Sequence, residues 1–204
     1  MFSADDHRFM AHALRLAERG LFTTTPNPRV GCVIVRDGVI VGEGWHERAG
    51  EAHAEIHALR AAGERARGAT AYVSLEPCNH TGRTPPCTNT LIESGIKRVV
   101  AAMADPNPLV AGSGLQALCG AGLETTVGLL EDEARELNNG FVSRMTRGRP
   151  WLRLKVAASL DGKTALNNGA SQWITDEAAR RDGHRWRARS CGVLTGIGTV
   201  KDDD

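Results

Sequence analysis

The chain has 204 residues, 41% of them hydrophobic, so it is long enough for one complete domain with a packed core and part of another. Its 25 Lys and Arg residues almost balance 24 Asp and Glu residues, and the net charge of +1 provides no basic field for nucleic acid or an anionic membrane. Aromatic residues make up only 4%, which leaves few platforms for stacking single-stranded bases. No run is apolar enough for a signal peptide or a membrane span. We therefore expect a soluble cytoplasmic protein that binds neither nucleic acid nor membrane.

Helical and strand patterns alternate along the first three quarters of the chain, which predicts an α/β layer sandwich with a mostly parallel sheet. Ser3 caps the first expected helix, and Asp37-Gly38 between two apolar runs is a hairpin signal. The expected elements are a helix to Arg19, strands Val30 to Val35 and Val39 to Trp45, a helix Ala52 to Ala62, a strand Thr70 to Leu75, a helix Cys87 to Glu93, a strand Arg98 to Met103, a helix Leu115 to Cys119, a strand Thr125 to Leu130 and a helix Glu131 to Met145.

One boundary cue interrupts this pattern, the run Arg147-Gly148-Arg149-Pro150. We therefore expect a first domain at residues 1–147 and a second, incomplete one at residues 148–204. A segment of fewer than about 60 residues buries too little surface to be stable alone. The segment 148–204 must therefore pack against the first domain, pair with the same segment of another chain or stay partly mobile.

Three metal ligands and one carboxylate stand out in the first domain: His53 and Glu55 in the run His53-Ala54-Glu55, then Cys78 and Cys87. A structural zinc site normally takes four protein ligands, whereas a catalytic one keeps three and leaves a position for water. One imidazole and two thiolates make three, so Glu55 is free to move protons. The pattern predicts a Zn²⁺-dependent hydrolytic site.

Residues two apart do not share a helix face, so His53 and Glu55 can meet one metal only from the end of a helix. We expect the helix over Ala52 to Ala62 to point its first turn at the site. Cys87 also opens an expected helix, and a helix N-terminus lowers the pKa of a thiol toward the thiolate that zinc requires. The other cysteines, Cys32, Cys119 and Cys191, stand among apolar neighbours and favour ordinary packing as reduced thiols.

The general zinc-deaminase signature, His-x-Glu with Pro-Cys-x-x-Cys, differs from this chain, which carries eight residues, Asn79 to Pro86, between its cysteines. In that polar loop His80 and Arg83 could hold a phosphate, although a solvated turn is an equal alternative. Asp105 and Asn107 follow an expected strand, as Cys78 does, so both loops should flank one pocket. For these two residues, turn chemistry beside proline is the alternative.

At these motifs the chain resembles the bifunctional deaminase/reductase family of riboflavin biosynthesis, almost from end to end. The matching segments are Pro26-Asn27-Pro28-x-Val30-Gly31, Gly42-x-Gly44-x-His46, His53-Ala54-Glu55, Leu75-Glu76-Pro77-Cys78-x-His80-x-Gly82-Arg83-Thr84-Pro85-Pro86-Cys87, Asp105-Pro106-Asn107-Pro108, Lys155-x-Ala157-x-Ser159-Leu160-Asp161-Gly162-Lys163, Ser171-x-Trp173-Ile174-Thr175 and Gly196-x-Gly198-Thr199.

The resemblance implies a three-layer α/β/α cytidine-deaminase-like domain with a mixed, mostly parallel sheet. It also implies deamination of 2,5-diamino-6-ribosylamino-4(3H)-pyrimidinone 5′-phosphate, with Glu55 as the catalytic proton carrier and Zn²⁺ on the three ligands above. The small-molecule substrate would be contacted by Asn27, His46, His80, Arg83, Asp105 and Asn107. A homo-oligomer, either a dimer or a tetramer, is expected.

The second segment resembles the start of the family's dihydrofolate-reductase-like α/β domain, which uses NADPH to reduce the ribosyl group. By this resemblance the residues that contact NADPH would be Ala157, Trp173, Thr199 and Asp203. Ser171 and Arg187 would face the substrate. Because later strands of that domain are missing, we expect no reductase activity from these residues alone.

Two rival functions remain open. A structural zinc module would need a fourth ligand, for which His80 or Cys32 are the candidates. A related deaminase could act on cytosine nucleosides, guanine or tRNA adenosine, but the long loop between the cysteines and the reductase-like segment speak against it. Low charge and scarce aromatic residues further weaken the tRNA alternative.

Overall fold

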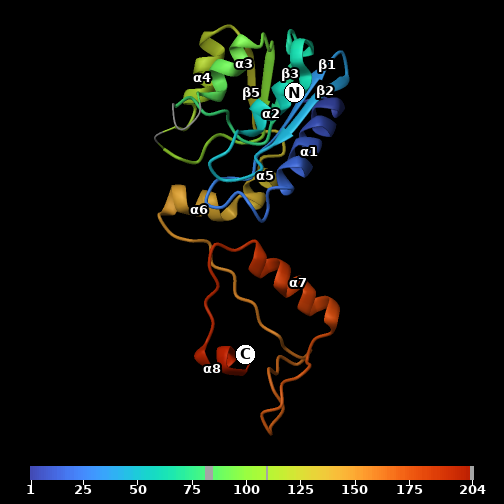
Figure 1. The fold of residues 1–204 in the computed structure, drawn as a ribbon, viewed down its shortest axis with the longest axis vertical. Helices are drawn as coiled ribbons and strands as arrows, with labels where there is room; N and C mark the ends of the chain where they lie inside the picture. The colour runs from blue at the N-terminus through green and yellow to red at the C-terminus, as the bar shows by residue number, and fades with distance from the viewer. Residues whose placement is uncertain (81–84, 109, 203–204) are drawn as a thin grey trace. The chain divides into compact units, whose positions relative to one another are not determined.

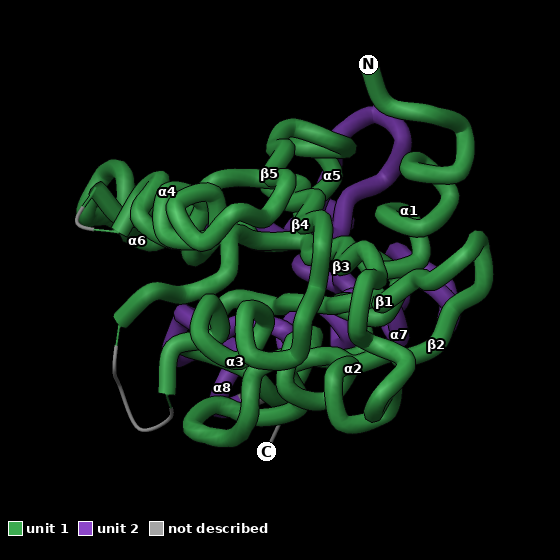
Figure 2. Tube along the Cα trace, turned by 90° about the horizontal axis from the view of Figure 1, so that it is seen from above, with its two compact units in different colours: residues 1–151 green, residues 152–204 purple. Residues whose placement is uncertain are grey.

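The computed structural model describes residues 1–80, 85–108 and 110–202. The chain divides into two compact units, Met1–Trp151 and Leu152–Asp204 (Figure 2). The linker expected at Arg147 to Pro150 lies just before this division, directly after the last helix of the first unit.

In the first unit, helices and strands alternate much as the sequence predicts (Figure 1). The elements are α1 (Ala4–Glu18), β1 (Gly31–Arg36), β2 (Val39–Trp45), α2 (Ala54–Ala62), the 3₁₀ helix η1 (Gly63–Ala66), β3 (Thr70–Val73), α3 (Cys87–Glu93), β4 (Arg98–Ala101), α4 (Ser113–Gly120), β5 (Glu124–Val127), α5 (Glu131–Leu137) and α6 (Asn139–Arg147).

Within the described residues the strands form one mixed sheet in the order β2-β1-β3-β4-β5. The β1–β2 hairpin is antiparallel, and β1 also pairs antiparallel with β3. The β3–β4 and β4–β5 pairs are parallel, as α-helical crossovers require. The expected mixed, mostly parallel sheet is thus confirmed: β2, β3, β4 and β5 run in one direction, and only β1 among the described strands runs against them, so both of its pairings are antiparallel.

Helices cover both faces of this sheet, which gives the three layers (Figure 1). Side chains of a strand alternate between faces, so neighbouring residues enter different cores. Val33 and Tyr72 belong to the core under α1 and α5. Ile34 and Val73 belong to the core under α2, α3 and α4. The expected α/β/α sandwich is therefore present.

The start of α1 is fixed by a buried carboxylate. Ser3 and Asp6 form a capping box, in which each side chain accepts a hydrogen bond from the other's backbone N–H. Asp6 Oδ1 also accepts hydrogen bonds from Tyr72 Oη and Arg98 Nη1, both at 2.8 Å. One carboxylate thereby joins the helix to β3 and β4.

The long helix expected from Glu131 to Met145 is wrong as a single element, because Asn138 interrupts it between α5 and α6. The Asn138 side chain is fully buried. Its Oδ1 accepts from the Arg29 backbone N–H at 2.8 Å, and its Nδ2 donates to the Arg29 carbonyl at 3.0 Å. These paired bonds hold the helix break against the loop before β1.

In the second unit the described residues form two helices, α7 (Glu177–Ala188) and α8 (Ile197–Asp202), and no strand. Asp176 caps α7 by accepting a hydrogen bond from the Ala179 N–H. Throughout the described part of the chain, no helix combines the length and apolar character needed to cross a membrane.

Candidate metal centre

The end of α2 that carries His53 and Glu55 is positioned by two glycines of β2. A Cβ atom on Gly44 would lie 2.4 Å from the Ala54 carbonyl oxygen, and one on Gly42 would lie 2.2 Å from that of Ala58. Neither distance is compatible with a larger side chain, so α2 lies directly on the backbone of β2. His53 is the N-cap residue, with an extended backbone, and Glu55 stands in the first turn. Both side chains therefore approach the site from the helix end.

The three predicted ligands lie together. Their ligand atoms, one from each of His53, Cys78 and Cys87, are all within 4.8 Å of one another. His53 Nδ1 is 3.2 Å from Cys87 Sγ and 3.5 Å from Cys78 Sγ. Cys87 is the first residue of α3, and its backbone N–H donates to Cys78 Sγ at 3.4 Å. An imidazole and two thiols at this spacing are a soft donor set that suits zinc.

The electrostatics of the cluster favour a cation. The hydrogen bond with Cys87 is the main cause that lowers the pKa of Cys78 to about 4. The same bond raises the pKa of Cys87, because the shared proton stays on that sulfur. The pKa of His53 is also raised, because its hydrogen bond with Cys78 outweighs burial, which acts in the opposite direction. Negative charge thus concentrates on sulfur at the point where the ligands converge.

No fourth ligand joins this group among the residues that the structure describes. Cys32 is buried near Glu55. Burial is the main cause that raises the pKa of its thiol, and the negative charge of Glu55 raises it further. His80 is exposed. Neither residue belongs to the cluster, so the fourth ligand that a structural zinc module requires is not supplied by either candidate.

Glu55 is only 3% exposed and lies against the ligands. Its carboxylate has a hydrogen bond with Cys87 and one with its own backbone N–H. Burial is the largest influence on this group and raises its pKa. A carboxyl group that is buried beside the ligands without being one of them is arranged to exchange protons with a bound molecule.

His46 and Asn27 form one wall of the site. The His46 ring is buried and lies edge-on to the His53 ring, with centroids 5.5 Å apart. Its Nδ1–H donates to the Ala52 carbonyl at 3.0 Å, and its Nε2 accepts from Asn27 Nδ2 at 3.1 Å. Burial lowers the pKa of His46, which agrees with this neutral tautomer. The Asn27 amide is thereby held in one orientation.

Asp105 and Asn107 lie in the loop after β4, where Asp105 Oδ1 accepts from the Asn107 N–H at 2.8 Å. Burial raises the pKa of Asp105, and the charges of Glu76, His80 and Cys78 also act on it. The loop after β4 is thus brought to the Cys78 side of the cluster, as expected of loops that follow neighbouring parallel strands. Arg83 lies outside the described residues.

Glu76 is a buried carboxylate that ties these loops together, a role that its residue type alone does not indicate. It accepts hydrogen bonds from backbone N–H groups of the loop after β4 and of α4. The sequence shows that Glu76 stands beside Pro77 and Cys78. It does not show that four backbone N–H groups from distant segments donate hydrogen bonds to its carboxylate.

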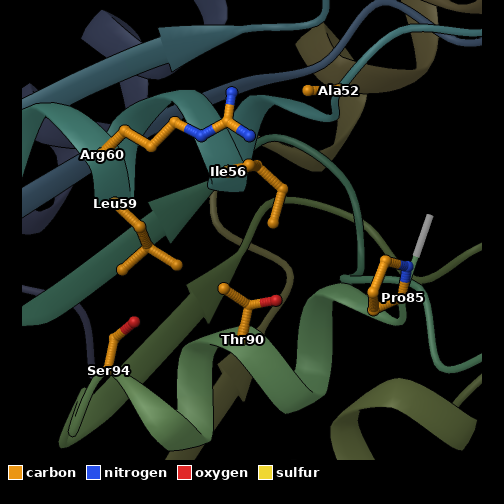
Figure 3. A pocket seen from close by; sticks show the side chains of 7 residues that line it. All are labelled: Ala52, Ile56, Leu59, Arg60, Pro85, Thr90 and Ser94. Carbon is orange, nitrogen blue, oxygen red and sulfur yellow. The ribbon is translucent and has the colours of Figure 1, made fainter.

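A groove of about 430 Å³ lies between α2 and α3, lined by Ala52, Ile56, Leu59, Arg60, Pro85, Thr90 and Ser94 (Figure 3). Ile56 and Leu59 of α2 point toward Thr90 of α3 in this view. Neither the three ligands nor Glu55 line this groove. Its lining is mainly uncharged, and the groove is separate from the ligand cluster.

The residues expected to bind NADPH or substrate in the second unit are mostly exposed. Ala157 is half-buried, whereas Ser171, Trp173, Arg187 and Thr199 are exposed. The Arg180 guanidinium stacks 4.5 Å from the Trp173 ring, and Arg187 Nη1 lies 3.3 Å from His184 Nδ1. Asp203 lies outside the described residues. These assignments stay predictions.

Comparison with protein families divides the chain in the same way. Residues 3–103 match the family described as cytidine and deoxycytidylate deaminase zinc-binding region, which supports zinc as the metal of the cluster of His53, Cys78 and Cys87. Residues 150–204 match the RibD C-terminal domain.

Full-length relatives match almost the whole chain. The riboflavin biosynthesis protein RibD of Escherichia coli (strain K12) is 61% identical over 199 residues, covering 98% of this chain and 54% of that protein. RibD of Haemophilus influenzae is 57% identical over 203 residues, covering 100% of this chain and 55% of that protein. The chain therefore spans about half the length of the curated relatives it matches.

Solved structures agree. Acinetobacter baumannii RibD, form 1, superposes with a TM-score of 0.92 at 57% identity, covering 98% of this chain and 56% of that one. A diaminohydroxyphosphoribosylaminopyrimidine deaminase/5-amino-6-(5-phosphoribosylamino)uracil reductase from Thermotoga maritima gives a TM-score of 0.91 at 45% identity, covering 98% and 57%. The cytidine-deaminase-like fold is thereby confirmed. Because identity, fold and the order of both domain types agree along nearly its whole length, the chain belongs to the RibD family of riboflavin biosynthesis proteins.

Proposed function

We propose that the first unit catalyses the zinc-dependent hydrolytic deamination of 2,5-diamino-6-ribosylamino-4(3H)-pyrimidinone 5′-phosphate. The products are 5-amino-6-ribosylamino-uracil 5′-phosphate and ammonia. The observation that carries this proposal is the convergence of His53, Cys78 and Cys87 within 4.8 Å beside the buried Glu55. The name of the Thermotoga maritima relative supports an aminopyrimidine as the substrate class.

In this mechanism His53, Cys78 and Cys87 hold the metal. Zinc, when bound, supplies a Lewis acid that lowers the pKa of water to about 7. Glu55 does the proton transfer: its carboxylate takes a proton from the attacking water and delivers it to the pyrimidine ring nitrogen. It then takes the second proton of that water and donates it to the departing amine, which leaves as ammonia. The net reaction replaces the ring amino group by oxygen and returns Glu55 to its starting charge.

Substrate binding is proposed for the residues around this cluster. Asn27, held in place by His46, presents its amide to the base, and Asp105 and Asn107 bind from the opposite loop. His80 and Arg83 are proposed for the ribose phosphate, since a guanidinium and an imidazole suit a phosphate dianion. The rigid Asn27–His46 pair would exclude water from the face of the base.

The test of the proposal is Glu55→Gln, which keeps the shape of the side chain and removes its capacity to carry protons. We expect ammonia release to fall at least about 100-fold, the usual contribution of a general acid–base group. Zinc content should stay unchanged, because Glu55 is not a ligand. Glu93→Gln removes the same charge from an exposed position at the end of α3 and should leave turnover unchanged.

The same assay has two outcomes that count against the proposal. Near-normal ammonia release by Glu55→Gln would show that another group carries the protons. If the zinc-loaded wild type releases no ammonia from the aminopyrimidine, the substrate assignment is wrong, and cytidine and guanine are the next amines to assay. Added NADPH is followed in the same cuvette, so that turnover by the second unit is measured separately.

For the second unit we propose that Ala157, Trp173, Thr199 and Asp203 contribute contacts to NADPH, and Ser171 and Arg187 contacts to the ribosyl substrate. We further propose a homo-oligomer, which sedimentation measures directly. A reducing compartment such as the cytoplasm suits the reaction, because both ligand thiols must stay reduced to bind zinc.

A further inference from the structure

The Glu76 carboxylate is 4% exposed and accepts four backbone hydrogen bonds. Oε2 accepts from the N–H groups of Asp105 at 2.9 Å and Gly112 at 3.0 Å. Oε1 accepts from those of Gly114 at 2.8 Å and Leu115 at 3.3 Å. Every acceptor site of a carboxylate is used in this way, and all of the donors are main-chain groups.

Three of these donors belong to the start of α4. Gly112, its N-cap residue, has φ +81° and no side chain to accept from the first turn. Glu76 supplies the missing acceptor and places a negative charge at the positive end of the helix dipole. Close packing supports the same arrangement, since a Cβ on Gly114 would lie 2.1 Å from the Pro77 carbonyl oxygen.

The fourth donor connects Glu76 with the candidate site. Asp105 lies on the loop after β4, and its carboxylate interacts electrostatically with Cys78 and His80. Glu76 is also tied to the segment just after β4, because its own N–H donates to the Met103 carbonyl at 2.9 Å. The segment that carries Cys78 and the segment that carries Asp105 are therefore joined through one side chain.

A helix cap alone does not require the bond to Asp105. The three amides at the start of α4 need an acceptor near them, but they do not need that acceptor to bind the Asp105 N–H as well. The fourth bond fixes the backbone of Asp105, so it sets where that carboxylate stands relative to the metal ligand Cys78. This is the property that a substrate contact needs and that a structural cap does not.

We propose that Glu76 is a positioning residue for the deamination: it holds the Asp105 backbone against the segment that carries Cys78, so that Asp105 meets the aminopyrimidine. The inference rests on the proposed function, because it assigns Asp105 to that substrate. Glu76 touches neither the substrate nor the metal in this scheme and acts only through Asp105.

The test is Glu76→Gln, which keeps the size of the side chain. In either orientation of the amide, its NH₂ group replaces one carboxylate oxygen. That NH₂ group then faces the two backbone N–H groups from which this oxygen had accepted hydrogen bonds. We expect KM for the aminopyrimidine to rise about tenfold, with kcat changed less than about threefold, because substrate binding is affected more than proton transfer. Zinc content should stay at the wild-type level.

The control for a loss of stability is Asp6→Asn, which removes another buried carboxylate that caps a helix, α1, on the other face of the sheet. It should lower the unfolding temperature without raising KM. If Glu76→Gln changes the unfolding temperature and leaves KM unchanged, as this control does, Glu76 is only a helix cap and the inference is wrong.

A double-mutant cycle with Asp105→Asn separates positioning from a direct role. Since Glu76 acts through Asp105, adding Glu76→Gln to Asp105→Asn should raise KM by less than about twofold. If the two substitutions instead raise KM independently, so that the increase in the double variant is the product of the two single increases, the inference is overturned.

Ammonia release by the wild type decides the proposed function separately. If the wild type releases none, hydrogen exchange of the Asp105 amide decides the anchoring: faster exchange in Glu76→Gln supports it, and unchanged exchange overturns it.

Discussion

Replacing Asp6 by Asn should destabilise the first unit strongly, because this one carboxylate joins α1 to two strands. Its Oδ2 accepts from the Ser3 N–H at 2.9 Å and the Ser3 hydroxyl at 3.0 Å. Its Oδ1 accepts from Tyr72 and from Arg98, both at 2.8 Å. Asparagine keeps one acceptor oxygen, so its NH₂ group must face either the Ser3 donors or the Tyr72 and Arg98 donors.

The magnitude follows from what is lost. A hydrogen bond to a charged group contributes about 1.5–3 kcal/mol, and a capping interaction about 1 kcal/mol. Because these bonds share one side chain, their energies are not additive, and we expect Asp6→Asn to reduce the free energy of unfolding by about 2–4 kcal/mol. The neighbouring Asp5 has a side chain that is 69% exposed and pairs with Arg8 in solvent. Asp5→Asn should therefore cost less than about 0.5 kcal/mol.

Urea unfolding of both variants, followed by circular dichroism, measures these differences. Burial alone would raise the pKa of Asp6, but the hydrogen bonds from Arg98, Ser3 and Tyr72 outweigh it and hold this pKa below its ordinary value. A lowered folded-state pKa contributes stability that is complete above the unfolded value of about 3.9 and is lost as the pH falls through the folded value. The gap between wild type and Asp6→Asn should thus be constant from pH 7 to about pH 4 and narrow below it. Equal costs for Asp6→Asn and Asp5→Asn at pH 7 would refute the reasoning.

Two further predictions concern the metal centre. Gly44→Ala should destabilise the first unit by about 3 kcal/mol and lower zinc retention, because the new Cβ meets the Ala54 carbonyl oxygen at 2.4 Å and pushes α2 away from β2. Gly120→Ala, where nothing lies within 4 Å, is its matched control in urea unfolding, and equal effects of the two would contradict the packing argument. Cys87→Ser should reduce bound zinc, measured by atomic emission after dialysis, at least about tenfold, because a buried thiolate ligand is lost. Cys119→Ser changes an exposed cysteine and should leave the zinc content unchanged. If Cys87→Ser also keeps its zinc, Cys87 is not a ligand.

Much of the first unit was predictable because its local signals agree with its packing. The Ser3 cap appears as a full capping box, and Asp37-Gly38 turns the hairpin with φ angles of 51° and 75°. The helix break at Asn138 falls in the run Asn138-Asn139-Gly140, which disfavours a continuous helix, so a local signal for it was present in the sequence and was not used. Its cause is a pair of hydrogen bonds to Arg29, and such long-range bonds leave no periodic signal in the sequence.

The metal centre was predictable where its residues carry chemistry of their own. Histidine, cysteine and glutamate in the run of His53, Glu55, Cys78 and Cys87 indicate a three-ligand site by type and number alone. The supporting residues were harder to find, since Glu76 resembles any other carboxylate until the amides of Asp105 and α4 are seen around it.

The spacing of His53 and Glu55 shows how backbone conformation resolves what a helical pattern forbids. On a continuous helix, residues two apart diverge by about 200°, so one of the two side chains would turn away from the metal. His53 avoids this because it is the N-cap, with φ −76° and ψ 163°, and only the residues from Ala54 onward follow the helical twist. The glycine at Gly44 in turn lets Ala54 rest on β2 at the depth where this cap meets Cys87. A helix that began one residue earlier would turn His53 away from Glu55, so the N-cap position of His53 is what lets the ligand and the proposed proton carrier face one site.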